Sequence, residues 1–374
     1  MSWHRLLAIL IKELRQVRRD RLTFAMMVAI PIVQLILFGY AINTDPKRLP
    51  MALVAADQSE FTRSLIAGLE NSQYFRIEKR AASEAEADRL LAHGDVQFVL
   101  VLPPDFTRRL LRGEHPSMLL AADASDPAAT GNALAALNGI AQRALSHDAA
   151  GALGAVQQDA TPYDIRVQRR YNPDGLTRYN IVPGLIGVIL TMTMVMMTAL
   201  AMTRERERGT MENLLATPAR PFEVMVGKIA PYILIGYVQV AVILVAARVL
   251  FDVPMVGSLW TLSLALVLFI AANLAVGFTF STIARNQLQA MQLTFFFFLP
   301  SMLLTGFMFP FRGMPEWAQA VGSVLPLTHF LRIVRGILLK GNGLVDIAPH
   351  LWPIALFMVV AGAVALKRYR QTLD

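Results

Sequence analysis

Apolar residues gather into six runs along this chain, and polar segments separate them. The first run covers residues 22–42 without a charge, and a membrane-spanning helix needs about 20 mainly apolar residues. A cleaved signal peptide has a shorter apolar core of about 7–15 residues, so we expect an uncleaved first span. Five more runs follow, at 179–203, 229–250, 259–283, 288–309 and 351–366. The pattern predicts an α-helical integral membrane protein with six transmembrane helices, arranged as one plus five.

The segment between the first and second spans, residues 43–178, has the size and polarity of a small soluble domain. Strand patterns at 51–56, 75–78, 96–102 and 117–122 alternate with helix patterns at 59–71, 84–92, 105–112 and 127–145. Such alternation predicts an α/β domain with helices packed on a sheet. No strand-to-helix turn carries a glycine-rich phosphate loop.

Residues 1–21 combine six Lys and Arg residues with apolar positions at helical spacing. One interpretation is a cytoplasmic amphipathic helix lying on the membrane surface. The other is a basic flank that only orients the first span.

The positive charges predict which way the chain crosses the membrane, because short loops rich in Lys and Arg stay in the cytoplasm. With a cytoplasmic N-terminus, segments 1–21, 204–228, 284–287 and 367–374 hold 15 Lys and Arg, against five in the short outer loops. Both termini are therefore expected in the cytoplasm, and the domain at 43–178 outside it. The net charge of +8 then reflects membrane topology, and we expect no nucleic-acid partner.

The segment at 204–228 reads RERERGTMENLLATPARPFEVMVGK. Charges of alternating sign could extend the second span, and a short helix would follow before Pro218 and Pro221. A short helix between charges and prolines can present a rigid surface to a partner. The alternative is a solvated loop whose arginines only maintain topology.

This segment resembles the cytoplasmic signature of ABC-2-type exporter permeases, with an ERE-x-GT-x-E-x-LL run and a later Pro, Glu and GK. Segments 11–16, 57–59, 171–173 and 326–336 are also similar to that family, so the resemblance extends over the whole chain. The matching positions of the signature are Glu205, Arg206, Glu207, Gly209, Thr210, Glu212, Leu214, Leu215, Pro218, Glu223, Gly227 and Lys228.

The resemblance implies a permease that dimerises, with itself or a sister permease, and docks a separate ATP-binding-cassette ATPase subunit. It implies a multi-pass protein of a bacterial inner membrane that exports drugs or other amphipathic molecules, and a periplasmic membrane-fusion adaptor as a further partner. Residues 227–228 lack the upstream glycine of a phosphate loop, so we expect no ATP site or cofactor on this chain. The expected coupling residues are Glu205, Arg206, Glu207, Gly209, Thr210, Glu212 and Glu223.

Two other segments are candidates for function. Phe295, Phe296, Phe297 and Phe298 lie within the fifth span, where they either contact lipid and a second copy or line a path for an amphipathic substrate. Residues 310–350 contain prolines and Trp317, and they predict short re-entrant or interfacial helices on the outer side, or an ordinary loop.

Several other functions fit the sequence less well. The chain has no cysteine, and no two of its six histidines have metal-ligand spacing on one element, so we expect no metal site and no enzyme activity. An ion-driven secondary transporter usually carries charged residues inside its spans, and these six runs hold almost none. A membrane-anchored sensor or assembly protein could use the outer domain, but the cytoplasmic segments are too short for a signalling domain.

Overall fold

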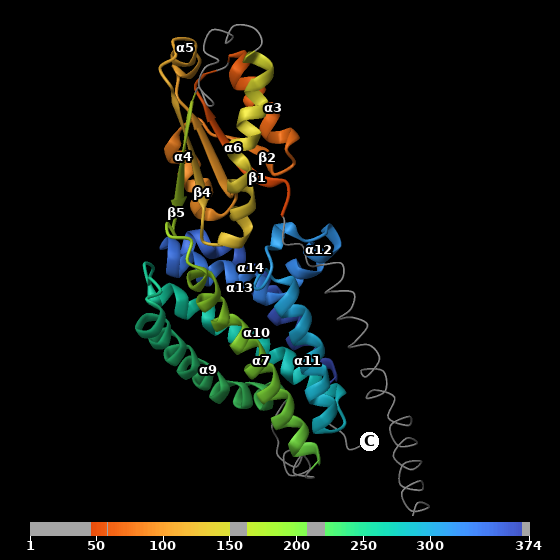
Figure 1. Cartoon of the computed structure of the whole chain (residues 1–374). Helices are drawn as coiled ribbons and strands as arrows, with labels where there is room; N and C mark the ends of the chain where they lie inside the picture. Colours follow the sequence, from red (N-terminus) through yellow and green to blue (C-terminus); the bar gives the residue numbers. More distant parts are fainter. Residues whose placement is uncertain (1–45, 58, 150–162, 208–220, 369–374) are drawn as a thin grey trace, which may run out of the picture.

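A computed structural model describes residues 46–57, 59–149, 163–207 and 221–368. It shows an α/β domain stacked on one end of a helical bundle (Figure 1). We call that end of the bundle the domain side and the opposite end the far end. The predicted surface helix at 1–21 and the first span at 22–42 lie outside the described residues.

A five-stranded sheet forms the centre of the α/β domain. Its strands are β1 (Leu49–Ala55), β2 (Phe75–Arg80), β3 (Phe98–Leu102), β4 (Ser117–Asp123) and β5 (Asp164–Arg170), in the order β2-β1-β3-β4-β5. Neighbouring strands are parallel except β3 and β4. Four strands match the predicted runs, and the expected α/β class is confirmed.

Helices cover both faces of the sheet. Apolar residues of α3 (Glu60–Asn71), α5 (Phe106–Leu111) and α6 (Pro127–Ala149) share one core with large strand residues such as Phe98. On the other face, α4 (Glu84–His93) packs on smaller residues such as Ala52 and Val99. Alternate strand positions therefore supply the two cores, as the two-residue period of a strand requires.

The fifth strand is a feature that the hydrophobic pattern did not predict. β5 lies at the edge of the sheet beside β4, and most of its side chains are exposed. It carries Asp164, Arg166, Arg169 and Arg170, and charges on an edge strand prevent pairing with other chains. Ile165 and Val167 are its only apolar residues, too few to mark a strand in the hydrophobic pattern.

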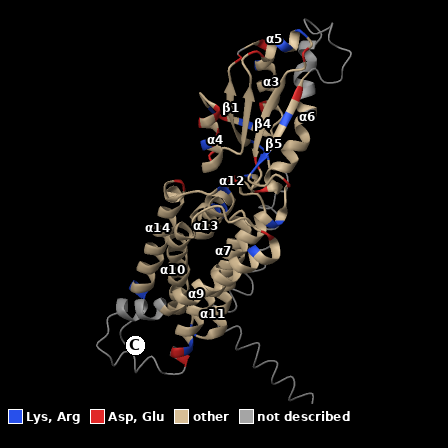
Figure 2. Cartoon of the chain, turned by 90° about the vertical axis from the view of Figure 1, so that its left-hand side faces the viewer, with Lys and Arg blue, Asp and Glu red and all other residues tan. Residues whose placement is uncertain are grey.

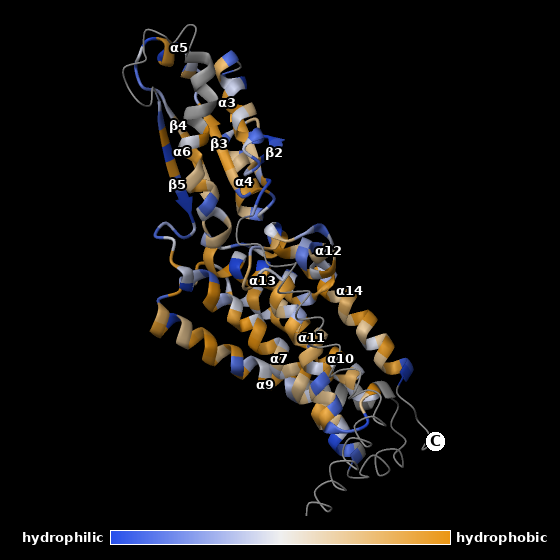
Figure 3. Cartoon of the chain, turned by 45° about the vertical axis from the view of Figure 1, so that its right-hand side comes forward, coloured by the Kyte–Doolittle hydropathy of each residue, from blue (hydrophilic) through white to orange (hydrophobic). Residues whose placement is uncertain are grey.

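Five helices in the described part of the chain are long and apolar enough to cross a membrane. They are α7 (Thr177–Glu207), α9 (Pro221–Phe251), α10 (Leu259–Ile283), α11 (Gln287–Leu304) and α14 (Leu344–Arg368). Their residues are mostly apolar along their length (Figure 3). Each helix covers most of one predicted run, but α9 begins eight residues before 229, α11 ends five residues before 309, and α14 begins seven residues before 351. Its first turns carry polar residues and bury Ile347 against the bundle.

Short helices occupy most of residues 310–350, as predicted for a re-entrant or interfacial segment. They are η2 (Phe311–Gly313), α12 (Glu316–Val324), α13 (Pro326–Arg335) and the π-helix η3 (Gly336–Lys340). Residues 316–324 and 326–340 bend against each other by 83°, and together they are apolar enough for a broken span. We call residues 316–340 the bent hairpin; it lies on the domain side of the bundle (Figure 1).

Close packing joins the spans to one another and to the bent hairpin. The ring of Phe269 in α10 stacks on that of Phe330 in α13, with centroids 4.1 Å apart. Where α10 crosses α7, a Cβ on Gly277 would lie 2.5 Å from the carbonyl oxygen of Val195. Small residues at such crossings let membrane helices approach closely.

Candidate functional site

The far end of the bundle holds part of the predicted coupling segment. α7 ends at Glu207, and α11 begins at Gln287 with Asn286 as its N-cap. The Gln287 backbone N–H donates to Glu207 Oε1 at 2.8 Å, and the Gln287 side-chain amide donates to Glu207 Oε2 at 2.5 Å. These hydrogen bonds lower the pKa of Glu207, which is exposed. Glu207 and Gln287, the far-end pair, thus join α7 to α11.

The other predicted coupling residues are placed only in part. Glu205 lies in the last turn of α7, so the charged run does extend the second span, as expected. The backbones of Arg206 and Glu223 lie in the last turn of α7 and the first turn of α9. Gly209, Thr210 and Glu212 lie outside the described residues. Figure 2 shows acidic and basic residues at this far end, and spans almost free of charge above it.

Gln287 is a residue that the sequence reasoning missed. It carries no charge and lies 80 positions from its partner, so no local pattern links the two. The available signal was Asn286, a residue type favoured as an N-cap, whose side chain accepts from Gln289 N at 2.8 Å.

The four consecutive phenylalanines of α11 do not share one environment. Phe297 makes an edge-to-face contact with Phe280 of α10, with ring centroids 6.0 Å apart. Phe298 packs against the main core of the bundle, whereas Phe295 is 36% exposed. Neighbouring helix residues differ by about 100° in direction, so the four rings cannot all face the same side of α11. That some of them line a substrate path stays a prediction.

On the domain side, a buried ion pair connects the two parts of the molecule. Lys340, at the end of the bent hairpin, places its Nζ 2.5 Å from Asp123 Oδ2 at the end of β4. The same ammonium donates to the Leu91 carbonyl and lies 5.0 Å from the ring centroid of Tyr171. Burial and the nearby charge of Asp123 raise the pKa of Tyr171 to about 12.

The end of α4 forms a second set of contacts with the bundle. Arg312 donates to the carbonyl of Gly94 at 3.2 Å, and Asn342 donates to that of Ala92 at 3.3 Å. His93 Nε2 lies 2.8 Å from Asp346 Oδ1 in the first turn of α14. Burial lowers the pKa of Arg312. These contacts fix the sheet domain on η2, on the turn after the bent hairpin and on α14.

A cavity of about 310 Å³ lies at the same junction. It is bounded by the start of α6, the start of α7 and the connection after α11, and its lining includes Asp126 and Asn180. Asn180 Nδ2 donates to Asp126 Oδ1 at 2.9 Å. Burial raises the pKa of Asp126, and the positive charge of Arg335 partly opposes that rise.

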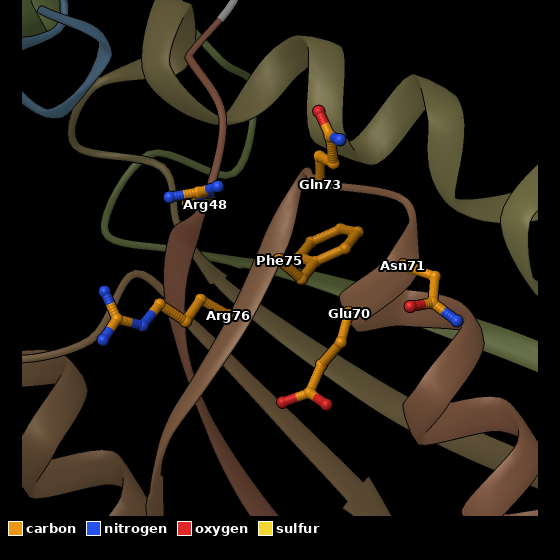
Figure 4. Close-up of a pocket in the computed structure, with 6 residues that line it drawn as sticks. All are labelled: Arg48, Glu70, Asn71, Gln73, Phe75 and Arg76. Atoms are coloured by element: carbon orange, nitrogen blue, oxygen red, sulfur yellow. The ribbon is translucent and has the colours of Figure 1, made fainter. Parts of the chain in front are cut away.

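A hollow of about 360 Å³ on the α/β domain has a different character. Figure 4 shows Arg48 and Arg76 on one side of it, with Glu70 below Phe75. All its charged side chains are exposed. Water already solvates them, so this hollow offers a ligand little gain from charge pairing.

Two histidines that are 21 positions apart in the sequence lie side by side in the structure. His329 of α13 and His350 of α14 lie with their Nδ1 atoms 3.4 Å apart, and His329 Nε2 lies 2.8 Å from the Ser323 carbonyl oxygen. Within the described residues, no group of three or more His, Cys, Asp or Glu could hold a metal ion. For the whole chain, the expectation of no metal site stays a prediction.

Comparison with known proteins agrees with this architecture. A family model described as "ABC-2 family transporter protein" matches residues 21–367. The chain is therefore a membrane permease of the ABC-2 transporter family, and it belongs to that family over nearly its whole length.

Individual relatives are similar along their full length. The chain is 30% identical to "Probable multidrug ABC transporter permease YbhS" of Escherichia coli, over 99% of this chain and 98% of that protein. It is 29% identical to "Inner membrane transport permease YhhJ" of Escherichia coli, over 97% and 96% of the two chains. It is 20% identical to "Linearmycin resistance permease protein LnrN" of Bacillus subtilis, over 98% and 99%. No solved structure matches the chain.

Proposed function

We propose that this chain is the permease subunit of an ATP-driven exporter that carries drugs or other amphipathic small molecules out of a bacterial cell. The far end would face the cytoplasm and the α/β domain the periplasm, with both termini in the cytoplasm. The excess of Lys and Arg in the far-end segments supports this orientation. The names of the relatives, which are multidrug, inner-membrane and resistance permeases, support the cargo and the location.

The observation that carries the proposal is the far-end pair. Glu207 is followed directly by residues 208–220, which hold half of the positions of the family signature. Its carboxylate accepts two hydrogen bonds from Gln287, the first residue of α11. A force applied to that segment by a partner would reach both α7 and α11. These two spans pack against each other, so their far ends would move as one unit.

The working assembly would contain further subunits. A separate ATP-binding-cassette ATPase would dock at residues 204–228, where carboxylates can pair with basic side chains of the partner. A second permease chain, identical or a sister, would complete the membrane path. A periplasmic membrane-fusion adaptor would contact the α/β domain.

The test is co-purification of ATPase activity with the tagged full-length chain from its native membrane, followed by export assays on two variants. Glu207→Ala removes both hydrogen bonds of the far-end pair, whereas Gln287→Ala removes only the one from the side-chain amide. Both variants should keep the ATPase bound but reduce export, Glu207→Ala by about tenfold and Gln287→Ala by less. The double variant should be no worse than Glu207→Ala alone, because the Gln287 side chain acts only through Glu207.

Three results would change the assignment. Normal export by both single variants would remove the far-end pair from the mechanism. Loss of the ATPase from Glu207→Ala but not from Gln287→Ala would make Glu207 a docking residue instead. A preparation without ATPase activity in any detergent would contradict the exporter itself.

A further inference from the structure

We propose that the cavity at the junction of the α/β domain and the spans binds an amphipathic organic cation, with Asp126 and Asn180 as its polar anchors. The cavity alone is the basis for the binding site. That the bound cation is cargo on its way out rests on the proposed function.

The lining of the cavity suits a molecule with a large apolar part. Most of its lining residues are apolar, and the two polar anchors lie among them. A volume of about 310 Å³ is at the lower end of the range for drug-sized ligands. The apolar lining residues are Pro127, Ala128, Ile181, Phe307, Met308, Phe309 and Pro310.

Asn180 presents an unused acceptor to this space. Its side chain is 5% exposed, and its amide group donates to Asp126. Its carbonyl oxygen Oδ1 has no hydrogen-bond partner among the described residues. A buried acceptor without a partner is unfavourable, and a ligand N–H donor would remove that penalty.

Asp126 places a carboxylate in the lining of the cavity, and its negative charge would favour a cation over a neutral ligand. It is the one ionisable residue among the described residues that line the cavity. Arg335 lies close enough to act on its charge; one of its terminal nitrogens donates to the Gly306 carbonyl at 3.1 Å, and the other two guanidinium nitrogens make no hydrogen bond with the described residues. No hydrogen bond between Arg335 and Asp126 is formed in the described part of the chain. The carboxylate therefore keeps acceptor capacity for an ammonium group, and such charge-assisted bonds are the stronger kind.

The position of the cavity connects binding to movement. Its walls come from the first turn of α6, the first turns of α7 and the segment after α11. The far-end pair joins the opposite ends of α7 and α11. A shift of these spans would change the width of the cavity, so binding and release of the cation would follow the state of the far end.

The experiment measures binding to the purified full-length chain in detergent, without ATP or an ATPase. The probe is dansylcadaverine, a fluorophore with an ammonium tail, and the matched probe is its N-acetylated, uncharged form. The wild-type chain should bind the charged probe about tenfold more tightly, as expected for one charge-assisted hydrogen bond. Because no transport is measured, failure of the exporter model would not affect this result.

Three variants decide the outcome. Asp126→Asn should abolish the preference for the charged probe, whereas Asp174→Asn removes an exposed carboxylate nearby and should keep it. Ala128→Trp, at an exposed position in the lining, should narrow the cavity and weaken the binding of both probes. An unchanged preference in Asp126→Asn, or unchanged binding of both probes in Ala128→Trp, would overturn the proposal.

Discussion

Asp123 and Lys340 form an ion pair across the junction of the two parts of the molecule, although 217 residues separate them in the sequence. Their side chains are 9% and 7% exposed. Removing one partner of a buried pair leaves an uncompensated charge and costs about 3–5 kcal/mol. The pair therefore favours one seating of the α/β domain on the bent hairpin.

Lys340→Met should consequently destabilise the protein by about 3 kcal/mol, while Lys340→Met with Asp123→Asn should be less harmful than the single change. Thermal unfolding of the detergent-solubilised chain measures both. The control is Lys79→Met, which breaks an exposed pair with Asp95 at 2.7 Å and should change stability by less than about 1 kcal/mol. Equal, small effects at Lys340 and Lys79 would mean that the junction pair does not hold the domain.

The Asp123–Lys340 pair also illustrates what the sequence could and could not predict. The spans and most strands follow from apolar runs, because burial in lipid or in a sheet requires apolar side chains locally. β5 (Asp164–Arg170) was not predicted, because an edge strand buries few of its side chains and so needs few apolar residues. The cavity at Asp126 and Asn180 could not be found either, since it depends on how three distant segments meet.

Gly277 should tolerate no side chain. A Cβ there would lie 2.5 Å from the Val195 carbonyl oxygen, a backbone atom that cannot turn aside. Gly277→Ala should force α7 and α10 apart and destabilise the bundle by about 1–3 kcal/mol, as overpacking does. Thermal unfolding would measure this, with Gly362→Ala in α14 as the control, because nothing lies within 4 Å of a Cβ there. An unchanged midpoint for Gly277→Ala would contradict the close crossing of the two helices.

Asp57 should make the α/β domain sensitive to acid. Partial burial disfavours its charge, but hydrogen bonds from Thr107 and Ser59 outweigh this and lower the pKa of Asp57 below its ordinary 3.8. The Thr107 and Ser59 backbone N–H groups donate at 2.8 and 2.9 Å. With a folded pKa below the unfolded one, the stabilisation is complete above about pH 4 and is lost as the pH falls through the folded pKa.

Asp57→Asn should therefore lower stability by about 1 kcal/mol at pH 7, because the amide nitrogen cannot accept one of the two backbone N–H hydrogen bonds that the carboxylate accepts. The difference between wild type and variant should shrink as the pH falls below 4. Unfolding midpoints of the full chain from pH 3 to pH 7 would show this convergence. A difference that stays constant over the whole range would mean that the charge of Asp57 is not involved.

Alanine substitutions at Phe295 and Phe298 should show which phenylalanine of α11 contributes to stability and which to export. Phe298 packs on the bundle core, so Phe298→Ala should destabilise by about 2 kcal/mol, less than the 3–5 kcal/mol of a fully buried ring. Phe295 is 36% exposed on the bundle surface, so Phe295→Ala should leave the unfolding midpoint within about 0.5 kcal/mol of wild type. The informative measurement on Phe295→Ala is export. A fall in export at unchanged stability would mean that this ring contacts a substrate or a second permease chain. Unchanged export would mean that Phe295 only faces lipid, and the phenylalanine run would then serve packing alone.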